Sequence, residues 1–387
     1  MYVTRPRSLY KRDREALSVP PPEGPNSGYL VIQDEEAETY SCFGMWKKKS
    51  IGDLPLPQNK NLTVVYSESS GDGVMVFCDK VIFIPVINHP LSSNRYYVIR
   101  RKGKHQGEAC TCSKEEDMAT CLCCNYIKDI KAKPLNPSNE FQHFEIIKRS
   151  CGFYAKSITS HAFPPHFLRR KHWTLCSTTP HHYHLVEALG LDPSLRAKLP
   201  PFTFPSSSSS SEPVVIGKWY CPFMFVKEEG VKVKEQMKRS VFYEMTLEQK
   251  WEKVFSKENN NNTNNEDVFV DVVVKTEGSV WEEGKFGDDG VMWFRSVNSE
   301  GEEKRVGLSM AIVERMRWEE EERGGWVGKK EKQVRFERVE KFEGINGKWE
   351  SFGFYVLVES FVLKRMDGSL VLTCDFMHTH HVRCKWV

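Results

Sequence analysis

The sequence predicts a β-rich α+β protein with two lobes of mainly antiparallel sheet and a few short helices. Three observations carry this prediction. Short runs of β-branched and aromatic residues recur along most of the chain. Two long runs near the C-terminus meet at Asp367-Gly368, a typical hairpin turn. A serine run at 206–211 separates two parts, and 387 residues are enough for two or three globular units.

Two stretches of biased composition set the expected domain boundaries. Residues 1–28 are rich in proline and glycine and are expected to form an extended N-terminal arm. An N-terminal β-rich lobe is expected at 29–200, a flexible Pro/Ser-rich linker at 201–216 and a C-terminal α+β lobe at 217–387. The asparagine-rich residues 258–266 are expected to form a disordered loop within the second lobe.

The N-terminal lobe is expected to consist mostly of strands. Its apolar runs are rich in β-branched and aromatic residues, and a glycine-rich turn at 71–73 joins two of them as a hairpin. The expected strands are 29–32, 62–66, 74–77, 81–87 and 95–100.

Two helices are expected in the C-terminal lobe. Thr246 and Gln249 match the capping box, in which the threonine hydroxyl and the glutamine side chain satisfy backbone amides at a helix start. Apolar residues then follow at helical spacing up to Phe255. Ser309 is expected to cap a second helix that runs to about residue 322.

The end of the chain predicts a long, central hairpin. Asp367 and Gly368 are expected to form a two-residue type I′ turn, which fixes the register of the two strands. Phe361 and Phe376 then lie on one apolar face that packs on the core, and the other face is also apolar. The predicted pairs are Arg365 with Leu370, Leu363 with Leu372, Phe361 with Cys374, Leu357 with His378, and Tyr355 with His380.

His378 and His380 end this apolar face, with Glu359 diagonal to His378. Imidazole and carboxylate are ligands that zinc accepts. The spacing fixes no further ligand, so we expect both histidines to form hydrogen bonds at the rim of the core, with metal binding as the alternative.

A cysteine-rich segment is the first alternative site. Cys110, Cys112, Cys121 and Cys123 could form a thiol- or zinc-dependent site. However, C-x-C is tighter than the usual zinc-ligand spacing, and acidic residues separate the two pairs. We therefore expect an exposed, reduced and metal-free loop, and no cofactor.

A basic and aromatic segment is the second alternative site. Basic residues beside aromatic rings can bind anionic ligands or RNA. The net charge of only +3 argues against a dedicated nucleic-acid binder. The residues of this candidate surface are Arg95, Tyr97, Arg100, Arg101, Lys102 and Lys104.

The sequence carries no motif of the common enzyme classes. Walker A, dinucleotide-binding and nucleophile-elbow patterns are all missing, so catalysis is not expected. The apolar run at 81–87 is far too short to span a membrane, and no apolar segment of a signal peptide follows the first basic residues. We expect a cytoplasmic protein, with a nuclear location as the alternative.

Several strings resemble a plant family of uncharacterised proteins, a domain of unknown function that is sometimes labelled "insecticidal crystal toxin domain". The resemblance spans nearly the whole chain and implies no catalytic or binding residue. The short strands and two modest helices do not match the long apolar helices of pore formers. We therefore expect a non-enzymatic interaction module with a protein partner, active in stress or defence. The strings include Tyr2-Val-Thr-Arg-Pro6, Pro20-Pro-Pro-Glu-Gly-Pro25, Leu91-Ser-Ser-Asn-Arg-Tyr-Tyr-Val-Ile99 and Gly217-Lys-Trp-Tyr220.

Overall fold

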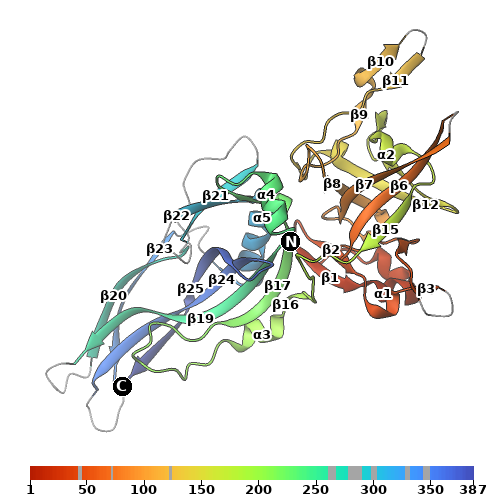
Figure 1. Cartoon of the computed structure of the whole chain (residues 1–387). Coiled ribbons are helices and arrows are strands. Elements are labelled where there is room, and N and C mark those ends of the chain that lie inside the picture. Colours follow the sequence, from red (N-terminus) through yellow and green to blue (C-terminus); the bar gives the residue numbers. More distant parts are fainter. Residues whose placement is uncertain are drawn as a thin grey trace.

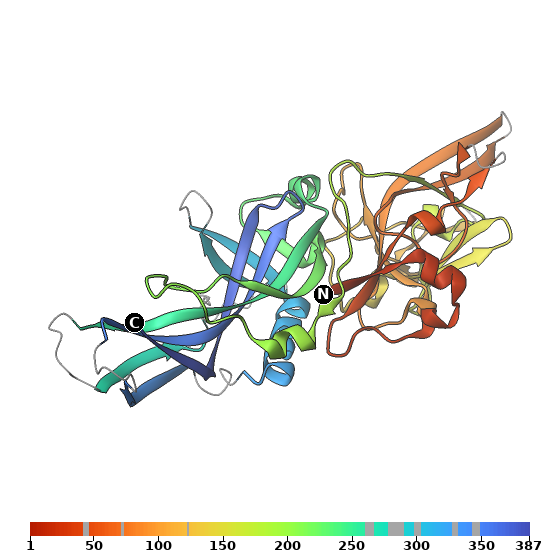
Figure 2. The ribbon, with the colours of Figure 1, turned by 90° about the horizontal axis from the view of Figure 1, so that it is seen from below.

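The computed structural model describes most of the chain and confirms the β-rich α+β class. Strands far outnumber helices, and most of them pair antiparallel. Figures 1 and 2 show an elongated molecule with a group of strands at each end. The described residues are 1–41, 46–70, 73–121, 124–259, 267–277, 290–297, 303–326, 332–342 and 349–387.

One seven-stranded sheet contains most of the strands expected before residue 200. Its strand order is β13-β12-β8-β7-β6-β15-β5. A core of buried residues that includes Phe83, Phe144 and Trp173 packs on it. Its strands are β5 (Ser50–Ile51), β6 (Asn61–Ser70), β7 (Gly73–Pro85), β8 (Arg95–Arg100), β12 (His143–Arg149), β13 (Gly152–Ser157) and β15 (Thr174–Thr178).

A second seven-stranded sheet joins the two ends of the chain. Its order is β2-β1-β17-β19-β24-β25, and β16 also pairs with β17. Figure 1 shows the long strands of this sheet reaching from the middle of the molecule to the end that carries the C-terminus. The strands are β1 (Tyr2–Pro6), β2 (Gly28–Ile32), β16 (Gly190–Leu191), β17 (Val214–Pro222), β19 (Phe242–Glu258), β24 (Ser351–Arg365) and β25 (Leu370–Trp386).

Smaller elements surround these two sheets. β18 (Val226–Glu228), β22 (Glu303–Ser309) and β21 (Val291–Val297) form a three-stranded sheet, and β20 (Asp267–Lys275) pairs with β23 (Gln333–Lys341). Short pairs are β3 (Tyr40–Ser41) with β4 (Trp46–Lys47), β9 (Ser113–Lys114) with β14 (Ala162–Phe163), and β10 (Met118–Cys121) with β11 (Cys124–Ile127).

The helices are short. The α-helices are α1 (Arg7–Arg12), α2 (His166–Arg169), α3 (Pro193–Lys198), α4 (Val233–Arg239) and α5 (Met310–Trp318), and α5 continues into the π-helical turn η7 (Glu319–Arg323). The 3₁₀ turns are η1 (Glu15–Ser18), η2 (Glu35–Ala37), η3 (Leu91–Ser93), η4 (Glu115–Asp117), η5 (Glu140–Gln142) and η6 (Phe223–Phe225). Among the described residues, no helix is long and apolar enough to cross a membrane.

The N-terminal residues do not form the expected extended arm. β1 lies parallel to β2 and pairs antiparallel with β17 at Tyr2 and Tyr220. Tyr2 and Val3 are buried in the same core as Tyr220, which explains why this segment is held in the sheet in spite of the prolines that follow.

The helix expected from Thr246 and Gln249 is instead part of strand β19. This strand pairs with β17 on one side and with β24 on the other, where Thr246 faces Val362 and Gln249 faces Glu359. Two flanking strands satisfy its backbone amides and carbonyls, so tertiary pairing overrides the local capping signal. The helix expected after Ser309 is confirmed as α5, although the serine side chain makes no capping hydrogen bond.

The predicted hairpin of β24 and β25 is confirmed, with corrections at both ends. The pairs from Leu357–His378 to Leu363–Leu372 are as predicted. Gly368 alone in the turn has a positive φ, 85°, and the Arg365 amide bonds to the Ser369 carbonyl. The turn is therefore a three-residue loop with a bulge, not a type I′ turn. A second bulge after Val356 places Tyr355 opposite Arg383, not His380.

Strand β24 lies between β19 and β25 and is covered on both faces, as expected for a central strand, but β25 is an edge strand, so the hairpin as a whole is not central in the sheet. Every residue from Phe352 to Leu363 is buried, and Phe361 and Phe376 pack in the same core. Neighbouring side chains on the opposite face, such as Val356, pack in a separate core with β20.

The serine run lies against β19, which differs from the flexible linker expected at 201–216. The amide of Ser211 donates to the Trp251 carbonyl at 2.9 Å, and the amide of Lys253 donates to the Ser209 carbonyl at 2.8 Å. The preceding Phe202 packs on Trp251 and Tyr355. Most of the expected asparagine-rich loop lies outside the described residues, from 260 onward.

Candidate functional site

A pocket of about 250 Å³ lies where α3 and the end of η7 meet the face of β19, β24 and β25. Its walls combine apolar side chains with a small number of polar groups, as in sites for small ligands. The apolar lining residues are Leu191, Pro193, Ala197, Leu199 and Leu357, and the polar ones are Arg196, Gln249, Arg323, Glu359, His378 and His381.

Strand pairing brings the polar groups of β19, β24 and β25 to one face. Gln249 pairs directly with Glu359, and His378 pairs with Leu357, two residues away from Glu359. Because residues two apart in a strand point to the same face, Gln249, Glu359 and His378 all point toward α3 and η7.

Helix α3 carries Arg196 across this face. The side chain of Asp192 accepts hydrogen bonds from the amides of Ser194 and Leu195, both at 3.0 Å, and Pro193 occupies the first turn. Both features favour a helix start at this point. One turn later, the Arg196 side chain is 9% exposed and reaches the glutamates of β24 and η7.

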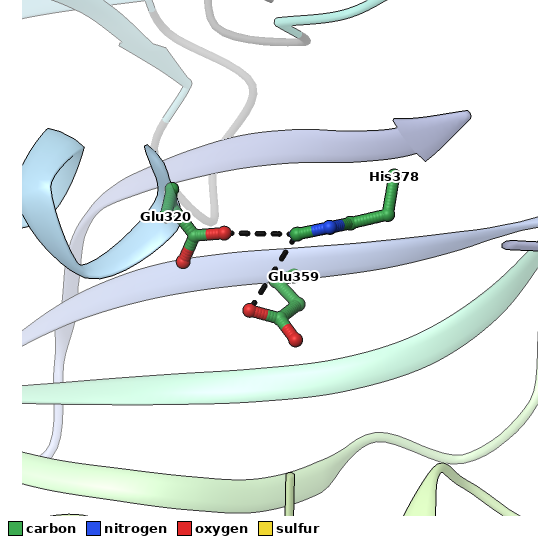
Figure 3. Close-up of side chains that lie close together, drawn as sticks. All are labelled: Glu320, Glu359 and His378. Carbon is green, nitrogen blue, oxygen red and sulfur yellow. Dashed lines mark hydrogen bonds and ion pairs between the residues drawn. The ribbon is translucent and has the colours of Figure 1, made fainter. Parts of the chain in front are cut away.

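The π-helical turn η7 supplies Glu319 and Glu320, both with 0% exposure. Single π-helical turns are rare and often occur at functional sites. Figure 3 shows the carboxylates of Glu320 and Glu359 at the same end of the His378 ring. The Nε2 atom of His378 is 2.8 Å from Glu320 Oε2 and 3.6 Å from Glu359 Oε2.

Arg196 contacts both glutamates of this group. Its Nε atom donates to Glu359 Oε1 at 3.1 Å, and its Nη2 atom donates to Glu359 Oε2 and, at 3.2 Å, to Glu320 Oε2. The Nη1 atom donates to the Glu319 carbonyl at 2.9 Å. The guanidinium fork thus binds Glu359 in a bidentate manner, the strongest arrangement of an ion pair. We call Arg196, Glu320, Glu359 and His378 the charge cluster.

Burial and pairing shift the pKa values of the cluster in different directions. Burial and the neighbouring Glu359 raise the pKa of Glu320 to about 7. Burial opposes ionisation of Glu359, but hydrogen bonds and charges from His378 and Arg196 outweigh it and hold the pKa of this carboxyl well below its usual range. Burial likewise disfavours a charged His378, but the two glutamates raise its pKa to about 9. Both raised pKa values favour retention of the proton between Glu320 Oε2 and His378 Nε2 as the pH rises.

Among the described residues, Glu320, Glu359 and His378 form the group that could hold a metal ion, with ligand atoms within 4.8 Å of one another. These ligand types suit zinc. However, Arg196 Nη2 already donates to the same Oε2 atoms of both glutamates. The guanidinium therefore fills the position of the cation. His380, expected beside His378, is exposed and outside this group.

The cysteine segment differs from the exposed loop that was expected. Cys110 and Cys112 are 3% and 1% exposed and pack in the core of the first sheet. Their amides donate to the carbonyls of Val98 and Phe141, which fixes this stretch beside β8. Burial raises the pKa of Cys110 to about 12 and that of Cys112 to about 11, so both are neutral thiols. The side chain of Cys121 and the whole of Cys123 lie outside the described residues.

The basic and aromatic segment does not form one binding surface. Tyr97 has 0% exposure, and its neighbours Tyr96 and Val98 are buried as well, because a core packs on each face of β8. Arg100 forms an ion pair with Asp79 at 2.6 Å and lies over the ring of Phe167. The remaining members range from half-buried Arg95 and Arg101 to exposed Lys102 and Lys104.

The sequence predicts two of the four residues of the charge cluster. Glu359 and His378 follow from the hairpin register, whereas the capping role predicted for Gln249 is wrong. Arg196 and Glu320 were missed. The available signal for Glu320 was the acidic run directly after the apolar helix α5, but nothing local marks Arg196.

The comparisons with known proteins cover other parts of the molecule or the fold alone. A family model described as "Protein of unknown function (DUF1262)" matches residues 23–125, which supports the label of a domain of unknown function for that segment. Among solved structures, the "Crystal structure of Cry35Ab1" is similar with a TM-score of 0.47 and 12% identity, covering 86% of this chain and 90% of that chain. No curated protein matches. The pocket residues, 191–381, all lie outside the family match.

Proposed function

We propose that this chain is a non-enzymatic binding protein whose pocket holds a small molecule. One observation carries the proposal. Gln249 and His378 line the pocket and are 1% and 0% exposed, yet Gln249 Oε1 and His378 Nδ1 have no hydrogen-bond partner among the described residues. A buried polar atom without a partner costs about 1–3 kcal/mol, so a ligand that forms a hydrogen bond with either side chain gains affinity.

The pocket chemistry supports binding over catalysis. None of the described lining residues is a serine, threonine, cysteine or lysine, the usual nucleophiles. The acid and base groups, Glu359 and His378, are held in ion pairs within the charge cluster. Groups fixed in this way are suited to position a ligand.

Ligand-observed NMR with a fragment set tests the proposal. Ala197 lines the pocket but is exposed, so Ala197→Trp should block the entrance without disturbing the core. Ser194→Trp, on an exposed position of the same helix outside the lining, is the matched control. Fragments that bind the wild type and Ser194→Trp but not Ala197→Trp support the proposal. A fragment set without any such compound contradicts it.

A protein partner is a second candidate function, and an exposed ribbon favours it. Residues 66–70 of β6 extend past the end of β15, and residues 73–80 of β7 extend past the end of β8, so in strand pairing these residues pair only with each other. Figures 1 and 2 show this ribbon projecting from the molecule. Val74, Met75 and Val76 on it are 67%, 58% and 65% exposed. Consecutive exposed apolar side chains mark interaction sites, because water contact with them is unfavourable.

Substitution on the ribbon tests this second function. Val76→Lys should abolish co-purification of a partner that is identified from the native source and reconstituted with the pure chain. Val215→Lys, an equally apolar residue with 49% exposure on β17, should leave that binding unchanged. Equal binding by both variants would contradict a role of the ribbon. A cytoplasmic location and a role in plant stress or defence stay proposals that rest on the sequence and the resemblance.

A further inference from the structure

The end of the serine run pairs with β19 in a defined register. Beyond the last β17 pair, residues 209–211 continue along the same edge of β19. Ser210 forms an antiparallel bridge with Glu252, and the Lys253 amide donates to the Ser209 carbonyl at 2.8 Å. Ser209 is therefore directly opposite Lys253, and the two side chains point to the same face.

This register gives each serine of the segment a different environment. Ser209 is exposed and faces Lys253. Ser210 is half-buried and faces Glu252, whose carboxylate would repel an added negative charge. Ser211 is 6% exposed, and its hydroxyl oxygen accepts from an amide of β19 at 2.9 Å. Of these three hydroxyls, that of Ser209 is the one that is both accessible to an enzyme and beside a cation.

Lys253 offers a positive charge to this hydroxyl. Its ammonium donates to the Ser206 carbonyl and lies 5.7 Å from the ring centre of Tyr355, but among the described residues it contacts no carboxylate. An ammonium has three donors, so it can bind an anion and keep the Ser206 contact. Opposite β carbons of an antiparallel pair are about 4.5–5.5 Å apart, which places a group bonded to Ser209 Oγ within reach of Lys253.

The charge around this pair is positive as well. Arg383 is exposed on β25 and lies over the rings of Phe202 and Trp251. The Lys385 ammonium donates to the Phe204 carbonyl. Neither cation forms an ion pair within the part of the chain that the structure describes. An anion attached to the segment is thus attracted to the face that Lys253 occupies.

The sequence beside Ser209 suits a protein kinase. Glu212 lies three residues after Ser209 and is exposed, so its carboxylate is available to an enzyme. Kinases select substrates by the charges that flank the serine, and acid-directed serine kinases bind a carboxylate at this position.

From these observations we propose that Ser209 is a phosphorylation site and that Lys253 holds the phosphoryl group. On the kinase, Ser209 Oγ attacks the γ-phosphorus of ATP. The Oγ–P bond forms while the bond from this phosphorus to the bridging oxygen breaks, ADP leaves with the electron pair, and the hydroxyl proton passes to the kinase. The product adds about −1.5 to −2 charge at pH 7, which forms charge-assisted hydrogen bonds with Lys253 and ties the segment to β19. This inference does not rest on the proposed pocket function.

Phosphorylation in vitro tests the site. The full chain is incubated with a purified acid-directed serine kinase and ATP, and peptide mass spectrometry locates the phosphate. We expect modification at Ser209, and Glu212→Gln should lower it at least about tenfold, because the kinase loses the carboxylate that it binds. Ser209→Ala should remove this modification. Phosphate confined to other serines, or no incorporation at all, would overturn the proposal.

Hydrogen exchange of the backbone amide at position 253 tests the contact, because this amide donates to the Ser209 carbonyl. Phosphorylation should slow its exchange about tenfold in the wild type, since new charge-assisted hydrogen bonds hold the segment on β19. Lys253→Met should lose this slowing. Lys250→Met is the matched control and should keep it, because Lys250 lies on the same strand and pairs with Glu252 at 2.9 Å on the opposite face. Equal slowing in both variants would show that Lys253 does not hold the phosphoryl group.

Discussion

Replacement of Arg196 by methionine is expected to lower the free energy of unfolding by about 3–5 kcal/mol. The guanidinium makes hydrogen bonds to Glu359, to Glu320 Oε2 and to the Glu319 carbonyl, and the side chain is 9% exposed. Methionine retains much of the apolar stem but leaves two buried carboxylates with His378 as their sole counter-charge within the cluster. Removal of one partner from a buried ion pair has this cost because the remaining charge stays out of water.

Equilibrium unfolding in urea, followed by tryptophan fluorescence, measures this effect. The matched control is Arg335→Met, because Arg335 forms an ion pair of 2.7 Å with Asp271 in which the two side chains are 58% and 41% exposed. Such an exposed pair contributes about 0–1 kcal/mol. If Arg196→Met lowered the stability no more than Arg335→Met, the charge cluster would not be buried as described, and the reasoning would be refuted.

Further predictions concern the metal, the pH dependence, the hairpin and the domain division. Dialysed Arg196→Met is expected to retain stoichiometric zinc and the wild type none, by elemental analysis, and zinc in the wild type would contradict the view that Arg196 fills the cation position. The pKa of His378 is raised from 6.5 to about 9, so its contribution of about 3 kcal/mol to the free energy of unfolding is complete below pH 6.5 and is lost as the pH rises through 9. Urea unfolding at several pH values should show this loss of stability in the wild type but not in His378→Gln. Phe361→Asp should unfold the second sheet by circular dichroism, whereas Leu370→Asp, at a position with 48% exposure on the same hairpin, should not; two folded variants would show that the burial is wrong. Thr203, Pro205 and Ser207 are exposed and lie in no helix or strand, although Ser209 and Ser211 are bonded to β19. We therefore propose that limited proteolysis first cuts between 200 and 215, and an earlier cut within 217–255 would place the boundary elsewhere.

The hairpin shows how far local sequence can predict this fold. Asp367-Gly368 gives the correct pairing from Leu357 to Leu363, because a bulge between the pairs Lys364–Leu370 and Leu363–Leu372 compensates for the extra residue in the turn. The turn itself was predicted one residue too short. Local signals cannot reveal the bulges, since these depend on how the long strands twist against their neighbours.

Strand β19 and the charge cluster show where such prediction ends. The capping pattern at Thr246 and Gln249 is a real local preference, but β17 and β24 offer a backbone partner on each side. Arg196 meets Glu359 and Glu320 across 163 and 124 residues of sequence. Contacts of that range arise from packing of whole elements, so no spacing in the sequence encodes them.

The position of β1 has a consequence for synthesis on the ribosome. This strand lies between β2 and β17, whose residues begin at 28 and 214, so it is made long before β17. The nascent chain can form the β1–β2 pair early, but the other edge of β1 has no strand partner until β17 has emerged. Non-local pairing of this kind folds slowly and leaves an open strand edge for aggregation. We therefore expect the yield of folded protein to depend on chaperones that shield Tyr2 and its neighbours until β17 arrives.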